Sequence, residues 1–125
     1  MVKRVLLIDE TGRCTPVYRA LIEAQDVVVI SEGLNAEAPG ALAATPVDLV
    51  LLDHDGPAGA ALDLARRLRH RPALGSTPIV ALSGFAVLNE LAAHRGALFA
   101  ALLPKPVVPA ALLASLREQL DRATG

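Results

Sequence analysis

Residues 49–57 of the chain read LVLLDHDGP, an apolar run that stops at two aspartates separated by one histidine. The run lacks the alternation of polar and apolar residues that a half-buried strand shows. This pattern favours a strand that is buried on both faces of a sheet. Glycine and proline follow the second aspartate, and both are typical of a turn. The stretch therefore predicts an inner strand that carries Asp53 at its carboxyl end, with Asp55 in the turn that follows.

Four more short apolar runs occur along the chain, and the segments between the runs have helical character. The predicted strands cover residues 5–8, 27–30, 47–52, 79–82 and 98–103. The predicted helices cover residues 15–24, 34–45, 58–70 and 86–95, and a last helix begins at Pro109. Five strands that alternate with five helices predict an α/β fold, in which a parallel sheet is covered on both faces and the crossovers are right-handed.

The composition limits the organisation and the partners of the chain. At 125 residues it has the length of one domain, so residues 1–125 are expected to form a single domain. No uninterrupted apolar run approaches the roughly 20 residues that cross a bilayer. A net charge of −1 gives no general attraction to nucleic acid or to anionic membranes. The lone cysteine suits a reducing compartment. We expect a cytoplasmic protein without direct membrane or nucleic-acid partners.

Charged and polar residues follow four of the predicted strands. Asp9 and Glu10 follow the first strand, Asp53 the third, Ser83 the fourth and Lys105 the fifth. In open parallel sheets, ligand sites form outside the carboxyl ends of the strands. We therefore expect these five side chains to meet at one edge of the sheet.

Phosphoryl transfer to a carboxylate is the chemistry that needs this set of groups. An aspartate is a weak nucleophile, and its attack on phosphorus brings two anions together, so a divalent cation and a positive side chain must neutralise charge. Magnesium prefers oxygen ligands. In this hypothesis Asp53 attacks, while Lys105 and Ser83 contact the phosphoryl oxygens. The acidic pair Asp9 and Glu10 would hold the ion.

These residues also carry a resemblance to the receiver domains of two-component response regulators, and the resemblance covers essentially the whole chain. The matching segments are LLIDE at 6–10, LVLLDHDGP at 49–57, IVALSG at 79–84 and LLPKPV at 102–107. Each motif alone is weak, but four in order at spacings close to those of the family are specific. The resemblance implies a flavodoxin-like fold, with a parallel sheet of strand order 2-1-3-4-5 flanked by five helices.

The resemblance further implies that a sensor histidine kinase or a histidine phosphotransfer protein phosphorylates Asp53 in a reaction that needs Mg²⁺ or Mn²⁺. Ser83 would be the switch hydroxyl, and Lys105 would match the lysine of the family. Such a domain is a signalling module with only self-phosphorylation and self-dephosphorylation chemistry, not a turnover enzyme. An output domain, a hybrid kinase or a second copy of the chain would be its further partners. The implied metal ligands are Asp9, Glu10, Asp53 and the backbone carbonyl of Asp55.

Positions 56, 61 and 102 are among those that depart from the pattern of the family, and two alternatives stay open. Gly56 stands where methionine is common, Ala61 where glycine is common, and Leu102 where many members carry a switching tyrosine or phenylalanine. A degenerate receiver would keep the fold and signal by phosphate-independent protein binding. A phosphohydrolase of the haloacid dehalogenase type would use Asp53 as nucleophile and Asp55 as acid and base, since the DxDG sequence fits that family locally.

Two further features are interpreted as structural. His54 follows Asp53 directly, so its side chain should point to the opposite face of the sheet. No second histidine or cysteine lies at ligand spacing, which argues against a metal ligand. The basic run at residues 66–71 closes a predicted helix, where cations favour the negative end of the helix dipole. We interpret this run as a solvated helix end.

Overall fold

The computed structural model describes residues 3–9, 15–24, 27–32, 47–54, 56–70, 74–94 and 98–124, with the backbone alone for 9, 15–18, 27–32 and 123–124. The strands are β1 (Lys3–Asp9), β2 (Val27–Glu32), β3 (Leu49–Asp53), β4 (Ile79–Ser83) and β5 (Ala101–Pro104). The helices are α1 (Thr15–Glu23), α3 (Ala58–Arg69), α4 (Phe85–Leu91), the 3-10 helix η2 (Ala92–His94) and α5 (Pro109–Thr124). The helix predicted over residues 34–45 lies outside the described residues.

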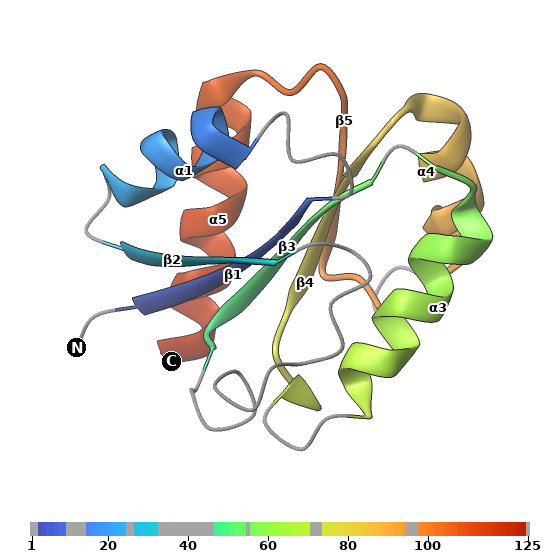
Figure 1. Cartoon of the computed structure of the whole chain (residues 1–125), viewed down its shortest axis with the longest axis horizontal. Coiled ribbons are helices and arrows are strands. Elements are labelled where there is room, and N and C mark those ends of the chain that lie inside the picture. The colour runs from blue at the N-terminus through green and yellow to red at the C-terminus, as the bar shows by residue number, and fades with distance from the viewer. Residues whose placement is uncertain are drawn as a thin grey trace.

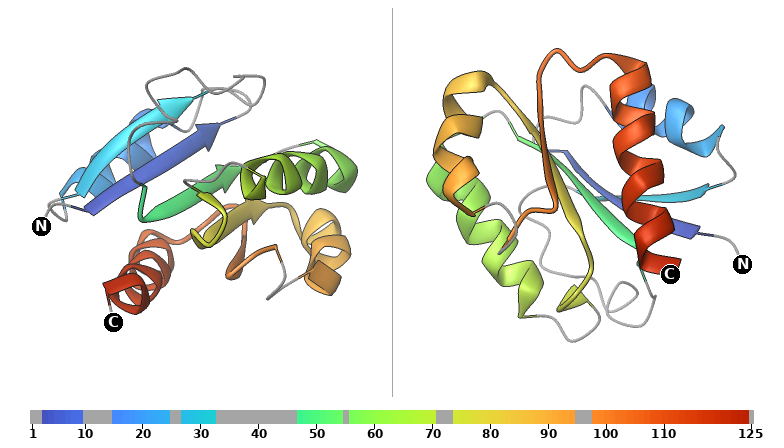
Figure 2. Two further views of the ribbon diagram at one scale, coloured as in Figure 1. Left: turned by 90° about the horizontal axis from the view of Figure 1, so that it is seen from below. Right: turned by 180° about the vertical axis from the view of Figure 1, so that it is seen from behind.

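The five strands form one parallel sheet of order β2-β1-β3-β4-β5 (Figure 1). The central strand β3 pairs with β1 on one side and with β4 on the other. Parallel neighbours need crossover connections, and these place helices on the faces of the sheet, as the views in Figure 2 show. The predicted α/β fold, with its flavodoxin-like strand order, is confirmed.

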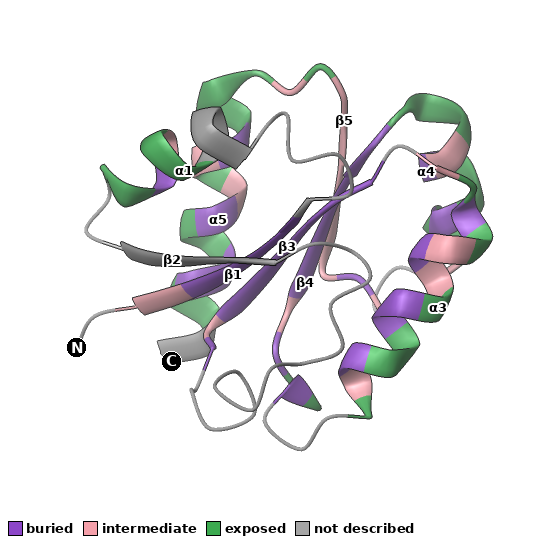
Figure 3. Ribbon diagram, viewed as in Figure 1, coloured by how far each residue is buried: buried purple, intermediate pink, exposed green. Residues whose placement is uncertain are grey.

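The sheet separates two hydrophobic cores. In β3, Val50 and Leu52 belong to the core that α3 and α4 complete, while Leu49 and Leu51 belong to the core under α1 and α5. Successive side chains of a strand point to opposite faces, so a strand with a core on each side must be apolar throughout. Figure 3 shows β3 and β4 buried along their length, whereas the helices expose their outer sides. Among the described helices, none is long and apolar enough to span a membrane.

The last strand is shorter than predicted. β5 begins at Ala101, so the strand expected from residue 98 is wrong for its first three residues. The N–H of Leu98 donates to the carbonyl of His94 at 2.9 Å and so continues the preceding turn, whereas the N–H of Ala100 reaches Ile79 of β4 at 2.8 Å. The helix predicted over 86–95 is also shorter, because η2 replaces its last turn. Burial of residue 99 in the core accounts for the apolar run without a strand.

Arg69 at the end of α3 contradicts part of the interpretation of the basic run. Its guanidinium donates hydrogen bonds to three carbonyls that lie before β4 and β5, those of Leu74, Thr77 and Leu98. The contacts to Leu74 and Leu98 measure 3.2 and 3.0 Å. Arg69 lies one helical turn after buried residue 65, and its burial lowers the pKa of the guanidinium. Residues 66 and 67 are exposed, as expected of a solvated helix end.

Candidate functional site

Asp53 lies at the carboxyl end of β3, and its side chain is only 1% exposed. Lys105 directly follows β5 and reaches the carboxylate from two strands away, with 2.5 Å between its Nζ and Oδ1 of Asp53. The lysine side chain is 14% exposed, and the peptide bond between Lys105 and Pro106 is cis. A buried carboxylate is costly unless a cation pairs with it. The structure therefore brings Asp53 and Lys105 together as a nearly buried ion pair.

Ser83 ends β4 and is fully buried. The backbone N–H of Lys105 donates to the carbonyl of Ser83 at 2.9 Å, which places the two residues side by side where β4 and β5 end. Within the described part of the chain, no hydrogen-bond partner reaches Oγ of Ser83, although solvent does not reach it either. Leaving a buried hydroxyl without a partner costs about 1–3 kcal/mol. Such an atom calls for an explanation, and a ligand that completes its hydrogen bonding is one.

Asp9 occupies the strand position next to Asp53. The parallel register of β1 and β3 pairs these two residues directly, so both stand at the carboxyl edge of the sheet. The side chain of Asp9 and the whole of Glu10 and Asp55 lie outside the described residues. Their roles as metal ligands therefore stay predictions.

Within the described ranges, no group of three or more histidine, cysteine, aspartate or glutamate side chains could hold a metal ion. The buried carboxylate of Asp53 offers the oxygen ligand that magnesium prefers, and the backbone of Asp9 holds the neighbouring strand position.

His54 is fully buried next to Asp53 and makes a contact that the sequence did not reveal. Its Nε2 lies 2.8 Å from the carbonyl oxygen of Pro57, which precedes α3. The only sequence signal for this contact was a histidine that directly follows an apolar strand and stands three residues before a proline. The contact is structural, in agreement with the interpretation of this histidine from the sequence.

The positions that depart from the family pattern have ordinary surroundings. Ala61 is fully buried in the core under α3, and Leu102 packs partly buried against the same core. Phe99 fills that core as well, with 1% exposure. The other phenylalanine, Phe85, opens α4 directly after Gly84 and is 70% exposed. With Val108, which is 63% exposed before α5, it leaves large apolar side chains open to solvent near the ends of β4 and β5.

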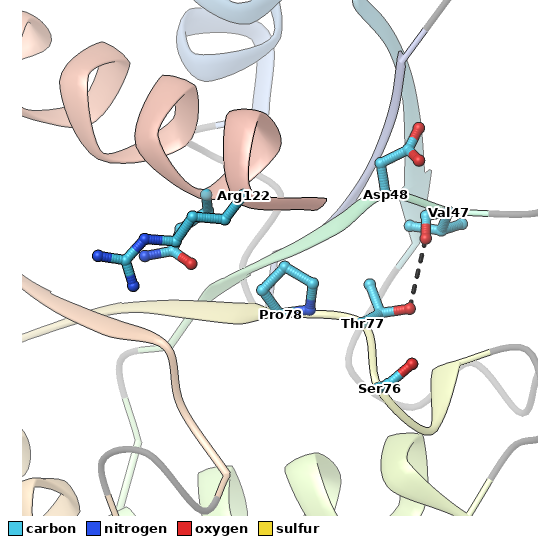
Figure 4. A pocket seen from close by; sticks show the side chains of 7 residues that line it. Val47, Asp48, Ser76, Thr77, Pro78 and Arg122 are labelled. Atoms are coloured by element: carbon cyan, nitrogen blue, oxygen red, sulfur yellow. Dashed lines mark hydrogen bonds between the residues drawn. The ribbon is translucent and has the colours of Figure 1, made fainter. Parts of the chain in front are cut away.

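A pocket of about 410 Å³ lies at the opposite edge of the sheet (Figure 4). Its lining comes from residues that precede β3 and β4 and from the last turns of α5. Thr77 in this pocket donates its hydroxyl to the carbonyl of Val47 at 3.3 Å. Asp53, Ser83 and Lys105 do not line it. The pocket is therefore separate from the cluster at the carboxyl edge.

Comparisons with known proteins agree with this architecture. No family model matches the chain, and no curated protein matches its sequence. A response regulator from Desulfuromonas acetoxidans is 25% identical, with a TM-score of 0.78 over 95% of this chain and 97% of that one. A CheY-like response regulator receiver domain protein from Methanospirillum hungatei JF-1 is 22% identical, with a TM-score of 0.81 over 99% and 98%. A sensor protein from Polaromonas sp. JS666 is 21% identical, with a TM-score of 0.80 over 97% and 98%.

The fold and the strand-end cluster thus define the class of domain. The chain has the flavodoxin-like fold of response regulator receiver domains, and the likeness extends over nearly the whole length of the chains compared. The resemblance that the four sequence motifs carry is confirmed at the level of the fold. Receiver domains are signalling modules rather than conventional enzymes.

Proposed function

We propose that this chain is a phosphoacceptor receiver domain of a two-component phosphorelay, phosphorylated on Asp53 in a reaction that needs Mg²⁺ or Mn²⁺. The observation that carries the proposal is the ion pair between Asp53 and Lys105 at the carboxyl edge of the sheet. A lysine held against a buried carboxylate supplies the positive charge that an incoming phosphoryl group needs. The phosphodonor is a sensor histidine kinase or a histidine phosphotransfer protein.

Each residue of the cluster has a role in this reaction. An oxygen of Asp53 attacks phosphorus, and the bond from phosphorus to the nitrogen of the donor histidine breaks. Lys105 neutralises charge that develops on the phosphoryl oxygens, and the Ser83 hydroxyl donates a hydrogen bond to one of them. Magnesium, when bound, supplies positive charge between the two anions. The residues that would hold it are Asp9, Glu10, Asp53 and the backbone carbonyl of Asp55.

Phosphorylation then changes an interaction surface. It replaces the single negative charge of the Asp53 carboxylate, which Lys105 balances in the free protein, with a phosphoryl group that carries about −1.5 to −2 charges. The Ser83 carbonyl accepts a hydrogen bond from the N–H of Lys105, so a shift of Ser83 toward phosphate would also displace the start of the β5–α5 connection. Two discrete arrangements of this region would provide the signal.

The apolar side chains near the site suit protein partners. Phe85 and Val108 are exposed near the ends of β4 and β5, where a phosphodonor must approach Asp53. The sensor protein from Polaromonas shares this fold, which suggests a place in a hybrid kinase, or beside an output domain, for this chain as well. A homodimer is a further candidate assembly. We place the phosphorelay in the cytoplasm, without direct contact to nucleic acid or membrane.

Intact-protein mass spectrometry tests the acceptor directly. Incubation with Mg²⁺ and acetyl phosphate should add one phosphate to the parent protein and to Asp63→Asn, but not to Asp53→Asn. Asp63 is the matched control, since it is an exposed aspartate of α3 that lies 3.9 Å from Arg66. Equal labelling of Asp53→Asn would overturn the proposal.

Labelling, Mg²⁺ titration and a phosphatase assay together distinguish the two alternatives. A parent protein that takes no phosphate and shows no saturable Mg²⁺ binding would support a degenerate receiver. Repeated turnover of a phosphomonoester, lost in Asp55→Asn, would support the phosphohydrolase.

A further inference from the structure

The imidazole of His54 joins the end of β3 to the beginning of α3. Its Nε2 lies 2.8 Å from the carbonyl oxygen of Pro57. A carbonyl only accepts hydrogen bonds, so Nε2 carries the proton and donates it. The same carbonyl accepts the N–H of Ala60 at 3.1 Å, within the first turn of α3. His54 thus attaches the residue before α3 to the strand that carries Asp53.

The backbone of His54 is held as well. Its N–H donates to the carbonyl of Leu82 in β4 at 3.0 Å. One residue therefore contacts β4 through its backbone and the start of α3 through its side chain, directly after the acceptor position. The residue is fully buried, so water does not compete for the imidazole.

Two described residues of the turn after His54, Gly56 and Pro57, offer little to fix its conformation. Gly56 has no side chain to pack, and Pro57 has no N–H to donate. Pro57 occupies the N-cap position of α3 without a side-chain cap. The hydrogen bond from His54 replaces such anchors, and it limits how far the start of α3 can move from Asp53.

We infer that His54 is a positioning residue for the acceptor site, an inference that rests on the proposed function. Its Nε2–H holds the start of α3 against the end of β3, the arrangement in which the site binds Mg²⁺ and accepts phosphate. Without the bond, the start of α3 takes more positions relative to Asp53, and Mg²⁺ binding must restrict them at the cost of affinity. The role depends on the N–H donor at Nε2. It does not depend on a change in the charge of the imidazole.

Two substitutions separate the donor from the bulk of the side chain. Gln places an amide N–H near the position of Nε2, whereas Leu fills the buried space without a donor. In His54→Leu we expect Mg²⁺ affinity and the rate of phosphorylation by acetyl phosphate to fall about five- to tenfold, the effect of losing one hydrogen bond. His54→Gln should keep both within about twofold of the parent protein.

A matched control removes the contribution of general destabilisation. Val50 lies on β3 in the core that α3 covers, so Val50→Ala destabilises the same part of the fold and leaves the His54–Pro57 bond intact. Denaturant unfolding ranks the variants by stability. Mg²⁺ affinity, measured by titration, is then compared between variants of similar stability. We expect Val50→Ala to keep the Mg²⁺ affinity of the parent. His54→Met, also without a donor, serves if the leucine variant does not fold.

The outcomes are distinct. If the parent binds Mg²⁺ and takes phosphate, and the variants without a donor match it, the role of His54 is refuted while the proposed function stands. Equal losses in His54→Gln and His54→Leu, or in Val50→Ala, would also refute it, because the donor would then not matter. A parent that neither binds Mg²⁺ nor takes phosphate overturns both.

Discussion

Asp53 and Lys105 are 52 residues apart in the sequence, yet Oδ1 of the aspartate lies 2.5 Å from Nζ of the lysine. The pair is almost without solvent contact, since the side chains of Asp53 and Lys105 are 1% and 14% exposed. In the proposed reaction, the positive charge of Lys105 would thus be in place when a phosphodonor arrives. Preorganisation of this kind avoids the cost of moving a charge at the moment of reaction.

Replacing Lys105 should destabilise the fold. Lys105→Met leaves the buried carboxylate of Asp53 without this cation, and breaking a buried pair in this way costs on the order of 3 kcal/mol. Denaturant unfolding at neutral pH measures the loss. Lys3→Met, at the start of β1 on the opposite edge of the sheet, is the control and should change little. Adding Asp53→Asn to Lys105→Met should recover stability, because a neutral amide needs no cation; no recovery would contradict the ion pair as the cause.

Removing the hydroxyl of Ser83 should leave stability unchanged or raise it by about 1 kcal/mol. A buried hydroxyl with no partner in the described structure carries a desolvation cost that Ser83→Ala removes. Thr77→Val is the contrasting variant, because the Thr77 hydroxyl donates to Val47 and its loss should cost about 1 kcal/mol. Thermal unfolding compares the two. A clear loss in Ser83→Ala, as large as that in Thr77→Val, would show that Oγ is already satisfied in the folded protein.

Arg69 should contribute much more to the stability of the fold than Arg67 of the same helix. Arg69→Ala removes the donor to three backbone carbonyls, and hydrogen bonds to charged groups contribute about 1.5–3 kcal/mol each before any water replaces them. Arg67→Ala, an exposed position of the same helix, should change stability by less than about 0.5 kcal/mol. Urea unfolding tests both. Arg69→Lys should rescue only in part, since an ammonium cannot reproduce the planar fork of the guanidinium.

Two leucines of α3 test which face of this helix is buried. Leu64 belongs to the core with 4% exposure, whereas Leu62 packs against that core only partly buried. Leu64→Ala should therefore lower the free energy of unfolding by about 2–5 kcal/mol, and Leu62→Ala by roughly half as much or less. Equal losses in denaturant unfolding would mean that the helix is rotated about its axis relative to the structure described.

The strand positions and the meeting of the charged residues could be predicted because both follow from simple constraints. Apolar runs without alternation, such as 49–52, require a core on each face, and the ends of parallel strands gather at one edge. The strand order came from the resemblance of the motifs, because periodicity alone does not say which strands are neighbours. Asp53 and Lys105 are brought together as expected, while the side-chain positions of Asp9, Glu10 and Asp55 stay predictions.

Other features could not be predicted, because different structures produce the same pattern. The run before Ala101 is apolar because Phe99 fills the core, and burial in a turn has the same sequence signature as burial in a strand. Arg69 lies at the edge of a basic run, and only the folded arrangement brings distant carbonyls to its guanidinium. The donor role of His54 likewise depends on the turn that returns Pro57 to it.

The position of Lys105 after the last strand has a consequence for synthesis. Chains leave the ribosome from the amino terminus, so Asp53 and Ser83 emerge well before the lysine. A partial chain that ends before β5 lacks the lysine that pairs with the Asp53 carboxylate, so burying this carboxylate is costly until Lys105 arrives. Under the proposed function, nascent or truncated chains should therefore not compete with finished molecules for phosphoryl groups.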